Sequence, residues 1–319
     1  MNNFLLYICK IVLLSYGIAY FLQNLADEGL LKSDIKMFLH WDSILQGKIN
    51  RELLILGSSR GVVSYDPDIF SNNTGLSSFN LSFDAASYNL QQIKFKAYLE
   101  KNSFPFIIVQ NVDISHFSKS ELIPQKEQFI PFISNDLLRY ELTRVEKGYK
   151  DNYYIPLAKY NRNQALLIKG LFNFFTRGEE TEINIQGFRP VSKKFIEDVH
   201  NLTRLKILEN DSLGFNNYLK GLEALEKQLT DKIPSNTLVF LVWAPEHIER
   251  LKFAPQVRNK VENYLIDLDN KFSNVFFLNY SKDSVFQNGN LFYDTFHLNK
   301  KGATIFSEKV SMDIVKIIR

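Results

Sequence analysis

Five short runs rich in apolar residues, separated by longer segments with helical spacing, constrain the fold of this chain more than any other feature. Short apolar runs bounded by turn residues are typical of strands that are covered on both faces of a parallel sheet. The runs are Glu52–Gly57, Ser78–Leu81, Phe106–Gln110, Thr237–Trp243 and Asn274–Leu278. Alternation of strand and helix along the chain predicts an α/β fold, a three-layer α/β/α domain with a central parallel five-stranded sheet.

The expected helices lie between and after these runs. Apolar residues recur at helical spacing in Ser87–Lys101, in about Glu246–Asn270 and in about Lys300–Ile318. Well over a hundred residues, about 117–236, separate the third and fourth strands, which is far more than a crossover connection needs. Because Asn161–Phe175 and Asn210–Asp231 also have helical spacing, we expect a large helical insertion after the third strand. We expect it to form a cap near the carboxyl ends of the strands, where the chemistry of such sheets lies.

The N-terminal segment has the length and composition of a membrane span. Phe4–Leu22 is almost continuously apolar, and its one charge, Lys10, lies near enough to the N-terminal end to snorkel. No small-residue cleavage site follows, which favours an uncleaved signal anchor over a removed signal peptide; the alternative is a buried or amphipathic helix of a soluble domain. The expected division is therefore a transmembrane anchor at 1–25, a linker or helix at 26–50 and the α/β domain at 51–319.

Composition excludes several classes of function. Lys plus Arg is 38 and Asp plus Glu is 35, so the net charge is 38 − 35 = +3, which predicts no nucleic-acid partner. Cys9 is the only cysteine, which excludes a disulfide framework and cysteine-rich metal sites. We expect no cofactor and no metal; Asp113 and His116 lie close together in sequence, but no third ligand is near.

Two short motifs carry residues suited to acyl chemistry. The first strand runs into Gly57-Ser58-Ser59-Arg60, which places serine hydroxyls at the carboxyl end of the strand. Such a turn also binds phosphate or caps a helix, but the loop lacks a Walker lysine and Gly-x-Gly-x-x-Gly spacing, which disfavours a nucleotide site. Near the C-terminus, Asp294 and His297 are three residues apart, so they would share one side of a helical turn. A carboxylate there can hold one ring nitrogen and leave the other to face a serine. The alternative is a helix cap with an exposed histidine.

Together the two motifs resemble the first and last blocks of the SGNH, or GDSL-like, hydrolase superfamily. The resemblance implies a flavodoxin-like fold and makes Ser59 the nucleophile, His297 the general base and Asp294 the acid that orients it. It also implies an oxyanion hole built from the backbone N–H groups of Ser59 and Ala85 and from the side chain of Asn111.

The middle blocks of the chain depart from the family pattern. The second block reads Asn80-Leu81-Ser82-Phe83-Asp84-Ala85, with Ala85 at the position of a glycine, so its N–H can donate only if the backbone turn is kept. The third strand ends in Gln110-Asn111-Val112-Asp113, without the glycine that usually precedes the asparagine. These departures leave open a second class of function, a catalytically inactive glycan-binding or assembly protein on the same fold.

An anchor, a G-S-S-R block and a large insertion occur together in membrane-anchored members that transfer acyl groups in bacterial envelopes. Examples are the D-alanyl transfer protein of teichoic acid modification and the alginate O-acetylation proteins. The similarity implies a serine esterase or O-acyltransferase that acts on an envelope or exported polysaccharide through an acyl-Ser59 intermediate. It also implies a single-pass protein of the cytoplasmic membrane, with a multi-span acyl donor as partner. The positive-inside rule points weakly to an extracytoplasmic, periplasmic catalytic domain.

Three further side chains are candidates for substrate contact. Arg60 adjoins the expected nucleophile and could pair with an anionic substrate or with a carboxylate such as Asp84. His247 follows the fourth strand and would lie near the site, unless it only begins a helix. Arg189, in the insertion, could bind a sugar acid or face solvent.

Overall fold

A computed structural model of the chain describes residues 2–114, 117, 122–176, 186–193, 195–197, 202–203, 212–287 and 289–319. Contacts within the chain divide it into two compact units. We call residues 1–48 with 121–185 the helical unit, and residues 49–120 with 186–319 the sheet unit.

The sheet unit is built on a five-stranded, all-parallel sheet with the strand order β2-β1-β3-β4-β5. The strands are β1 (Leu53–Leu56), β2 (Ser78–Asn80), β3 (Ile107–Val112), β4 (Leu238–Trp243) and β5 (Val275–Asn279). All five expected strands are present, and their order is that of the flavodoxin-like doubly wound fold. In this fold the strand order reverses between β1 and β3, and the crevice at the carboxyl ends of these two strands is the usual binding site.

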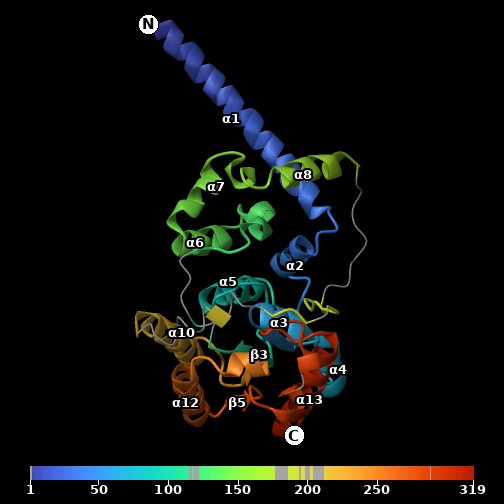
Figure 1. Cartoon of the computed structure of the whole chain (residues 1–319). Helices are drawn as coiled ribbons and strands as arrows, with labels where there is room; N and C mark the ends of the chain where they lie inside the picture. The colour runs from blue at the N-terminus through green and yellow to red at the C-terminus, as the bar shows by residue number, and fades with distance from the viewer. Residues whose placement is uncertain are drawn as a thin grey trace. The chain divides into compact units, whose positions relative to one another are not determined.

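Helices cover both faces of the sheet (Figure 1). The helices of the sheet unit are α3 (Ser59–Ser64), α4 (Pro67–Thr74), α5 (Tyr88–Leu99), α10 (Ser212–Asp231), α11 (Ile248–Leu251), α12 (Pro255–Lys271) and α13 (Lys300–Ile318). Short 3-10 turns lie at η4 (Ser284–Gln287) and η5 (Gly289–Leu291). The predicted helices at 87–101, 210–231 and 300–318 are confirmed, each to within a few residues.

One apolar core fills the space between the sheet and the layer of α4 and α13. Side chains alternate between the two faces of a strand, so Leu53, Val109 and Phe240 point to the same side. They pack there with Phe70 of α4 and Phe306 of α13. Burial of such side chains, at about 1.5–3 kcal/mol each, is what holds the helices on this face.

The opposite layer contains α5, α10 and α12, and polar contacts tie these helices together. Gln110 of β3 donates to Gln91 of α5 at 2.9 Å. Tyr264 of α12 donates to Glu226 of α10 at 2.5 Å. The sheet is therefore the middle of three layers, as expected from the alternation in the sequence.

The single helix expected over 246–270 is wrong, because the segment forms two helices, α11 and α12. The break falls at Ala254, which has a left-handed conformation with φ +53°, directly before Pro255. A proline disfavours helical backbone in the residue before it and lacks the N–H that would continue the helix. Pro255 is instead the first residue of α12, where no N–H is needed.

The helical unit begins with the apolar N-terminal helix. Its elements are α1 (Asn2–Leu31), α2 (Lys36–Leu45), η1 (Lys126–Phe132), α6 (Asp136–Val145), η2 (Lys147–Lys150), α7 (Asp151–Tyr154), η3 (Ala158–Tyr160) and α8 (Gln164–Thr176). Among the described residues, α1 is the one helix long and apolar enough to cross a membrane, and its apolar window is fully exposed. It could therefore anchor the protein in a membrane.

The unit boundaries differ from the linear division expected from the sequence. The helix α1 continues to Leu31, and α2 lies within 26–50, the segment expected to be a linker or helix. Trp41 of α2 donates to Gln128 of the insertion at 2.9 Å, and Asp27 of α1 accepts from Lys159 at 2.6 Å. Residues 26–48 and 122–176 thus form one packed body, whereas the later part of the insertion belongs to the sheet unit.

Candidate active site

Ser59 lies directly after the first strand, at the carboxyl edge of the sheet. β1 ends at Leu56 and α3 begins at Ser59, so only Gly57 and Ser58 form the turn between them. Ser58, at the N-cap position, makes no side-chain capping bond to the helix. The Ser59 N–H belongs to the first turn of α3, and such groups have no acceptor within their own helix.

Two glycines allow the segment after β2 to pack closely against this turn. A Cβ atom at Gly57 would lie 3.0 Å from the Cβ of Asn111 and 3.2 Å from the Oγ of Ser82. A Cβ atom at Gly61 would clash with the same Ser82 hydroxyl. The side chain of Ser82, in the second block, therefore packs directly against the backbone of this turn.

Asp294 and His297 lie on a bent loop before α13, and not on the helical turn that we expected from their spacing. An antiparallel bridge between Phe292 and Leu298 closes the loop. Within it, Asp294 Oδ1 accepts the backbone N–H groups of Phe296 and His297, both at 2.7 Å. The same carboxylate thus shapes the loop and is free to hold the imidazole with its other oxygen.

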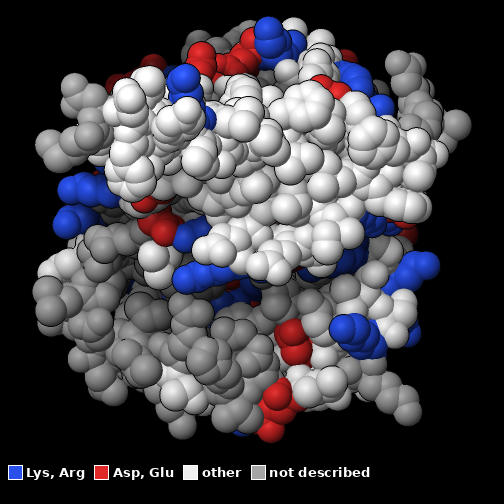
Figure 2. All heavy atoms as spheres, turned by 90° about the horizontal axis from the view of Figure 1, so that it is seen from above, with Lys and Arg blue, Asp and Glu red and all other residues white. Residues whose placement is uncertain are grey.

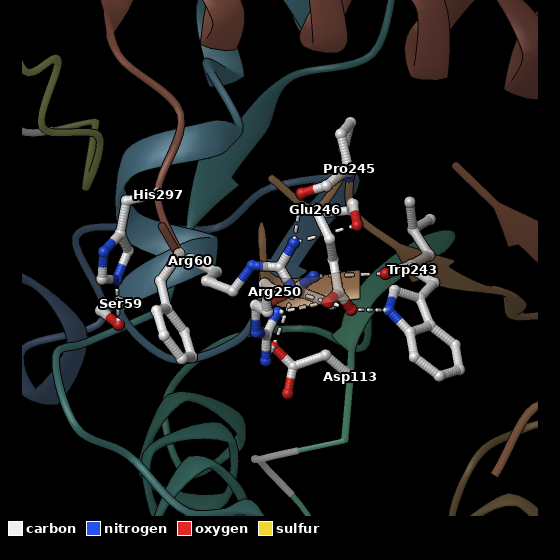
Figure 3. Close-up of polar contacts among 12 residues, drawn as sticks. Ser59, Arg60, Asp113, Trp243, Pro245, Glu246, Arg250 and His297 are labelled. Atoms are coloured by element: carbon white, nitrogen blue, oxygen red, sulfur yellow. Dashed lines mark hydrogen bonds and ion pairs between the residues drawn. The ribbon is translucent and has the colours of Figure 1, made fainter. Parts of the chain in front are cut away.

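Ser59, His297 and Asp294 form a continuous hydrogen-bonded chain. His297 Nε2 lies 2.8 Å from Ser59 Oγ (Figure 3). His297 Nδ1 lies 2.8 Å from Asp294 Oδ2. With Nδ1–H donated to the carboxylate, Nε2 accepts the proton of the serine hydroxyl. All three side chains are partly exposed, so an incoming group can reach them.

The electrostatics of the pair favour a charged Asp294. Burial by itself would raise the pKa of this carboxyl group, but the hydrogen bond and charge of His297 and the two backbone N–H donors outweigh burial and lower the pKa. An ionised carboxylate holds the imidazole in one tautomer and stabilises the imidazolium that forms when the serine is deprotonated. The Tyr293 ring stacks on the imidazole with an interplanar angle of 7° and further restricts its orientation.

Ala85 keeps the backbone conformation that the glycine of this block would supply. Its φ is +56°, in the left-handed region that residues with a Cβ rarely adopt. The position therefore holds a left-handed turn at some cost in strain, and the role of the Ala85 N–H as an oxyanion donor stays a prediction.

Asn111 is not placed as an oxyanion donor, which corrects the expectation from the sequence. It lies within β3, fully buried, and its amide group donates to the Tyr65 hydroxyl at 3.0 Å and to the Val242 carbonyl at 3.2 Å. The strand continues to Val112, two residues beyond the run that we recognised, so Asn111 faces the core and not the edge. Its role is to bond Tyr65 and β4 in the interior.

Arg60 does not face the substrate side either. The guanidinium is only 2% exposed; it pairs with Asp113 at 2.8 Å and donates to the carbonyls of Ala244 and Pro245 at 2.9 and 2.5 Å. Figure 3 shows it reaching away from Ser59 and His297. The alternative that Arg60 pairs with a carboxylate is confirmed, but the partner is Asp113 and not Asp84. Instead, Arg60 attaches the first turn of α3 to the ends of β3 and β4.

A buried charge cluster surrounds the Arg60 side chain, and sequence analysis missed it. Its members are Arg60, Asp113, Glu246, Arg250 and Arg258, all nearly or fully buried. Glu246 pairs with Arg258 at 2.7 Å and with Arg250 at 3.2 Å, and its Oε1 accepts the indole N–H of Trp243 at 2.6 Å. Glu246 and Arg250 are four residues apart directly after the fourth strand, a spacing that could have indicated a pair on one helical face.

Arg189 lies beside the second block, where it pairs with Asp84. Its guanidinium donates to both oxygens of that carboxylate, at 2.5 and 2.8 Å, and its backbone N–H bonds the Val62 carbonyl of α3. The side chain remains about half exposed. Its position near Ala85 fits substrate contact, but its charge is already matched by Asp84.

His247 is the N-cap of α11, which is the alternative that we gave from the sequence. Its Nδ1 accepts the Glu249 N–H at 3.3 Å, and its ring stacks on Phe195 and meets the edge of Phe292. Burial lowers the pKa of His247. These contacts explain the position of the ring, and contact of His247 with a substrate stays a prediction.

The described residues contain no group of three or more His, Cys, Asp or Glu side chains that could hold a metal ion. His116 lies outside the described residues. Comparison of the chain with models of known protein families finds no match, and a search of curated protein sequences likewise finds none.

Proposed function

We propose that the protein is a membrane-anchored, SGNH-like serine esterase or O-acyltransferase that acts through an acyl-Ser59 intermediate. The observation that carries the proposal is the hydrogen-bonded chain of Ser59, His297 and Asp294. These residues lie near the start and the end of the sequence of the sheet unit, and the fold brings them together. A partly exposed serine paired with an imidazole that a carboxylate orients is the arrangement that activates a hydroxyl for nucleophilic attack.

In the first half of the reaction, His297 Nε2 removes the Ser59 proton as Oγ attacks the carbonyl carbon of an ester. The carbonyl oxygen becomes an oxyanion, to which the N–H groups of Ser59 and Ala85 donate. The tetrahedral intermediate collapses, the bond to the leaving oxygen breaks, and His297 returns its proton to that oxygen. The result is an acyl ester on Ser59 and a free alcohol.

In the second half, an acceptor hydroxyl takes the place of the leaving alcohol. His297 removes the acceptor's proton, the acceptor oxygen attacks the acyl carbon, and Ser59 leaves with the proton from the imidazole. Water as the acceptor gives hydrolysis, whereas a glycan hydroxyl gives O-acyl transfer. Because Asn111 bonds Tyr65 and Val242, the oxyanion hole in this mechanism consists of backbone donors.

The anchor supports a substrate that is available at a membrane surface, such as an envelope or exported polysaccharide. We place the sheet unit on the extracytoplasmic side of the cytoplasmic membrane, with a multi-span membrane protein as the source of acyl groups. The apolar α1 and the weak charge asymmetry around it support this placement.

The test uses the full-length protein in detergent with p-nitrophenyl acetate, with nitrophenolate release and intact mass as readouts. We expect turnover and an acetyl adduct that both require Ser59 and His297, so Ser59→Ala and His297→Ala should abolish them. Ser58→Ala is the matched control, because it removes the neighbouring hydroxyl and should leave turnover intact. A folded wild-type protein with neither adduct nor turnover would contradict the proposal and favour a non-catalytic glycan-binding protein.

A second arm of the test separates the two reactions. Adding an unacetylated polysaccharide to the acetylated enzyme should move the acetyl group to glycan hydroxyls, detectable as new ester on the polymer, if the protein is a transferase. Release of free acetate at an unchanged rate would identify an esterase.

A further inference from the structure

The helix α8 has its apolar face outward. Ile168, Phe172 and Phe175 are 68%, 65% and 74% exposed and, at spacings of four and three residues, lie on one side of the helix. The buried side instead contains Gly170 and the polar Asn173. A helix on the surface of a soluble protein shows the opposite arrangement, with its apolar stripe turned to the core.

The buried side of α8 packs on the C-terminal part of α1. A Cβ atom at Gly29 would clash with the Gly170 backbone, and one at Gly170 would clash with that of Ala26. The two helix backbones therefore touch, as small residues allow in membrane helix pairs. Lys169 pairs with Asp34 at 3.3 Å and fixes the helix further.

The point of crossing lies just past the exposed apolar stretch of α1. Side chains of α1 are exposed from Phe4 to Leu22, and burial begins at Gln23. A bilayer core of about 30 Å needs about 20 apolar helical residues, so the residues up to Leu22 suffice to cross it. α8 then lies where α1 leaves the hydrocarbon.

A second exposed apolar segment contacts α1. Tyr153, Tyr154 and Ile155 are exposed, and the Tyr154 carbonyl accepts from the Tyr16 hydroxyl of α1 at 2.9 Å. Tyrosine is enriched at membrane–water interfaces, where its ring meets acyl chains and its hydroxyl meets water. Figure 2, a view from above, shows a broad, mostly uncharged face (white) with charged side chains of both signs at its margin.

We propose that α8 and Tyr153–Ile155 lie in the headgroup and upper acyl region of the bilayer that α1 enters. The occupant of this apolar face is lipid, because the face is continuous with the exposed apolar surface of α1 and lies at its interfacial end. The helical unit then contacts the membrane through α8 and Tyr153–Ile155 as well as through α1. The proposal rests on α1 as a membrane helix and is independent of the chemistry at Ser59.

The test measures the environment of single spin labels on the full-length protein in vesicles of phosphatidylcholine and phosphatidylglycerol. Cys9→Ser removes the native thiol, and Ile168→Cys, Phe172→Cys and Phe175→Cys each add one label site. Leu13→Cys on α1 and Met312→Cys on α13 are the lipid and water controls, since both residues are exposed. Collision rates with oxygen, which concentrates in lipid, and with a water-soluble nickel complex report the surroundings of each label.

We expect labels on α8 to resemble Leu13, with high oxygen and low nickel collision rates. Nickel collision rates like those at Met312 would overturn the proposal, because the face would then be in water. Protection from both reagents would also overturn it, since a second copy of the chain would then cover the face. If Leu13 itself were exposed to nickel, α1 would not span the bilayer and the premise would fail.

Discussion

Glu246 should be the most sensitive member of the buried charge cluster, and Arg250 the least. The cluster contains three guanidinium groups and two carboxylates, so its net charge is 3 − 2 = +1. Glu246→Gln leaves three cations beside one anion. Arg250→Met instead leaves the two pairs Arg60–Asp113 and Arg258–Glu246, which balance.

The pKa shifts give the magnitude. Burial alone would raise the pKa of Glu246, but the charges of Arg250 and Arg258 outweigh it and lower the pKa to about 2 from 4.5. At about 1.4 kcal/mol per pKa unit, the charged form is favoured in the folded state by about 3 kcal/mol. Arg250 has the opposite balance: burial and repulsion from the other arginines exceed the attraction of Glu246 and Asp113 and lower its pKa. Losing the Arg250 charge should therefore cost less stability than losing the Glu246 charge.

The assay is urea unfolding in detergent, followed by tryptophan fluorescence. Trp41 belongs to the helical unit and Trp243 to the sheet unit, so a Trp41→Phe background leaves a single reporter that bonds Glu246 directly. We expect Glu246→Gln to lower the free energy of unfolding by about 3 kcal/mol, and Arg250→Met to lower it by less. Equal losses, or a larger loss for Arg250→Met, would refute the charge-balance reasoning.

The same carboxylate makes a prediction about pH. A carboxyl group with a lowered folded-state pKa contributes stability above its unfolded pKa, here about 4.5, and loses it as pH falls toward about 2. The wild-type protein should lose stability over this window, and Glu246→Gln should lose less. Parallel curves for the two proteins would contradict the assigned cause.

Three further predictions concern the site and its surroundings. Asp294→Asn should lower turnover by a factor on the order of 10⁴ in a folded protein. Its amide oxygen stays bonded to the two backbone N–H groups, so its NH2 group faces Nδ1 and donates to it, which moves the imidazole proton to Nε2. A steady-state assay with p-nitrophenyl acetate checks this, and a loss below tenfold would contradict it. Ala85→Gly should preserve turnover. Ala85→Val should lower the melting temperature by an amount equivalent to about 1–3 kcal/mol, because a β-branched residue is strained at φ +56°. Equal melting temperatures for Ala85→Val and the wild-type protein would be inconsistent with the strained turn. Because burial lowers the pKa of His247, its contribution to stability is present above pH 6.5 and is lost as pH falls through its folded-state pKa. His247→Asn keeps a helix-capping side chain, so it should make the free energy of unfolding depend less on pH below pH 6.5. An unchanged pH dependence would show that His247 is not the titrating group.

The fold could be predicted from sequence because each strand of a doubly wound sheet is buried on both faces and reads as a short apolar run. Ser59, Asp294 and His297 could be chosen for a related reason. Each lies in a short local motif directly after a strand or before a helix, and the parallel sheet brings such positions to one edge.

The residues that were missed depend on long-range packing. Arg60, Asp113, Glu246 and Arg258 come from separate segments, and which charges meet in the interior is set by how these segments pack. Asn111 was misassigned because β3 runs to Val112, and a strand longer by two residues turns an edge residue into a core residue. The packing of residues 122–176 against α1 and α2 could not be predicted from the spacing of apolar residues either. Three apolar side chains of α8 face outward, so they do not indicate which helix α8 packs against.

Labelling with a fluorophosphonate tests the central claim, that His297 activates Ser59, most directly. The reagent phosphonylates a serine only when its oxygen is activated as a nucleophile, and intact mass with peptide mapping identifies the residue. We expect the full-length wild-type protein and Ser58→Ala to gain one phosphonyl group, on Ser59, and Ser59→Ala and His297→Ala to gain none. A folded wild-type protein that stays unlabelled, or that is labelled at Ser58, would contradict the account.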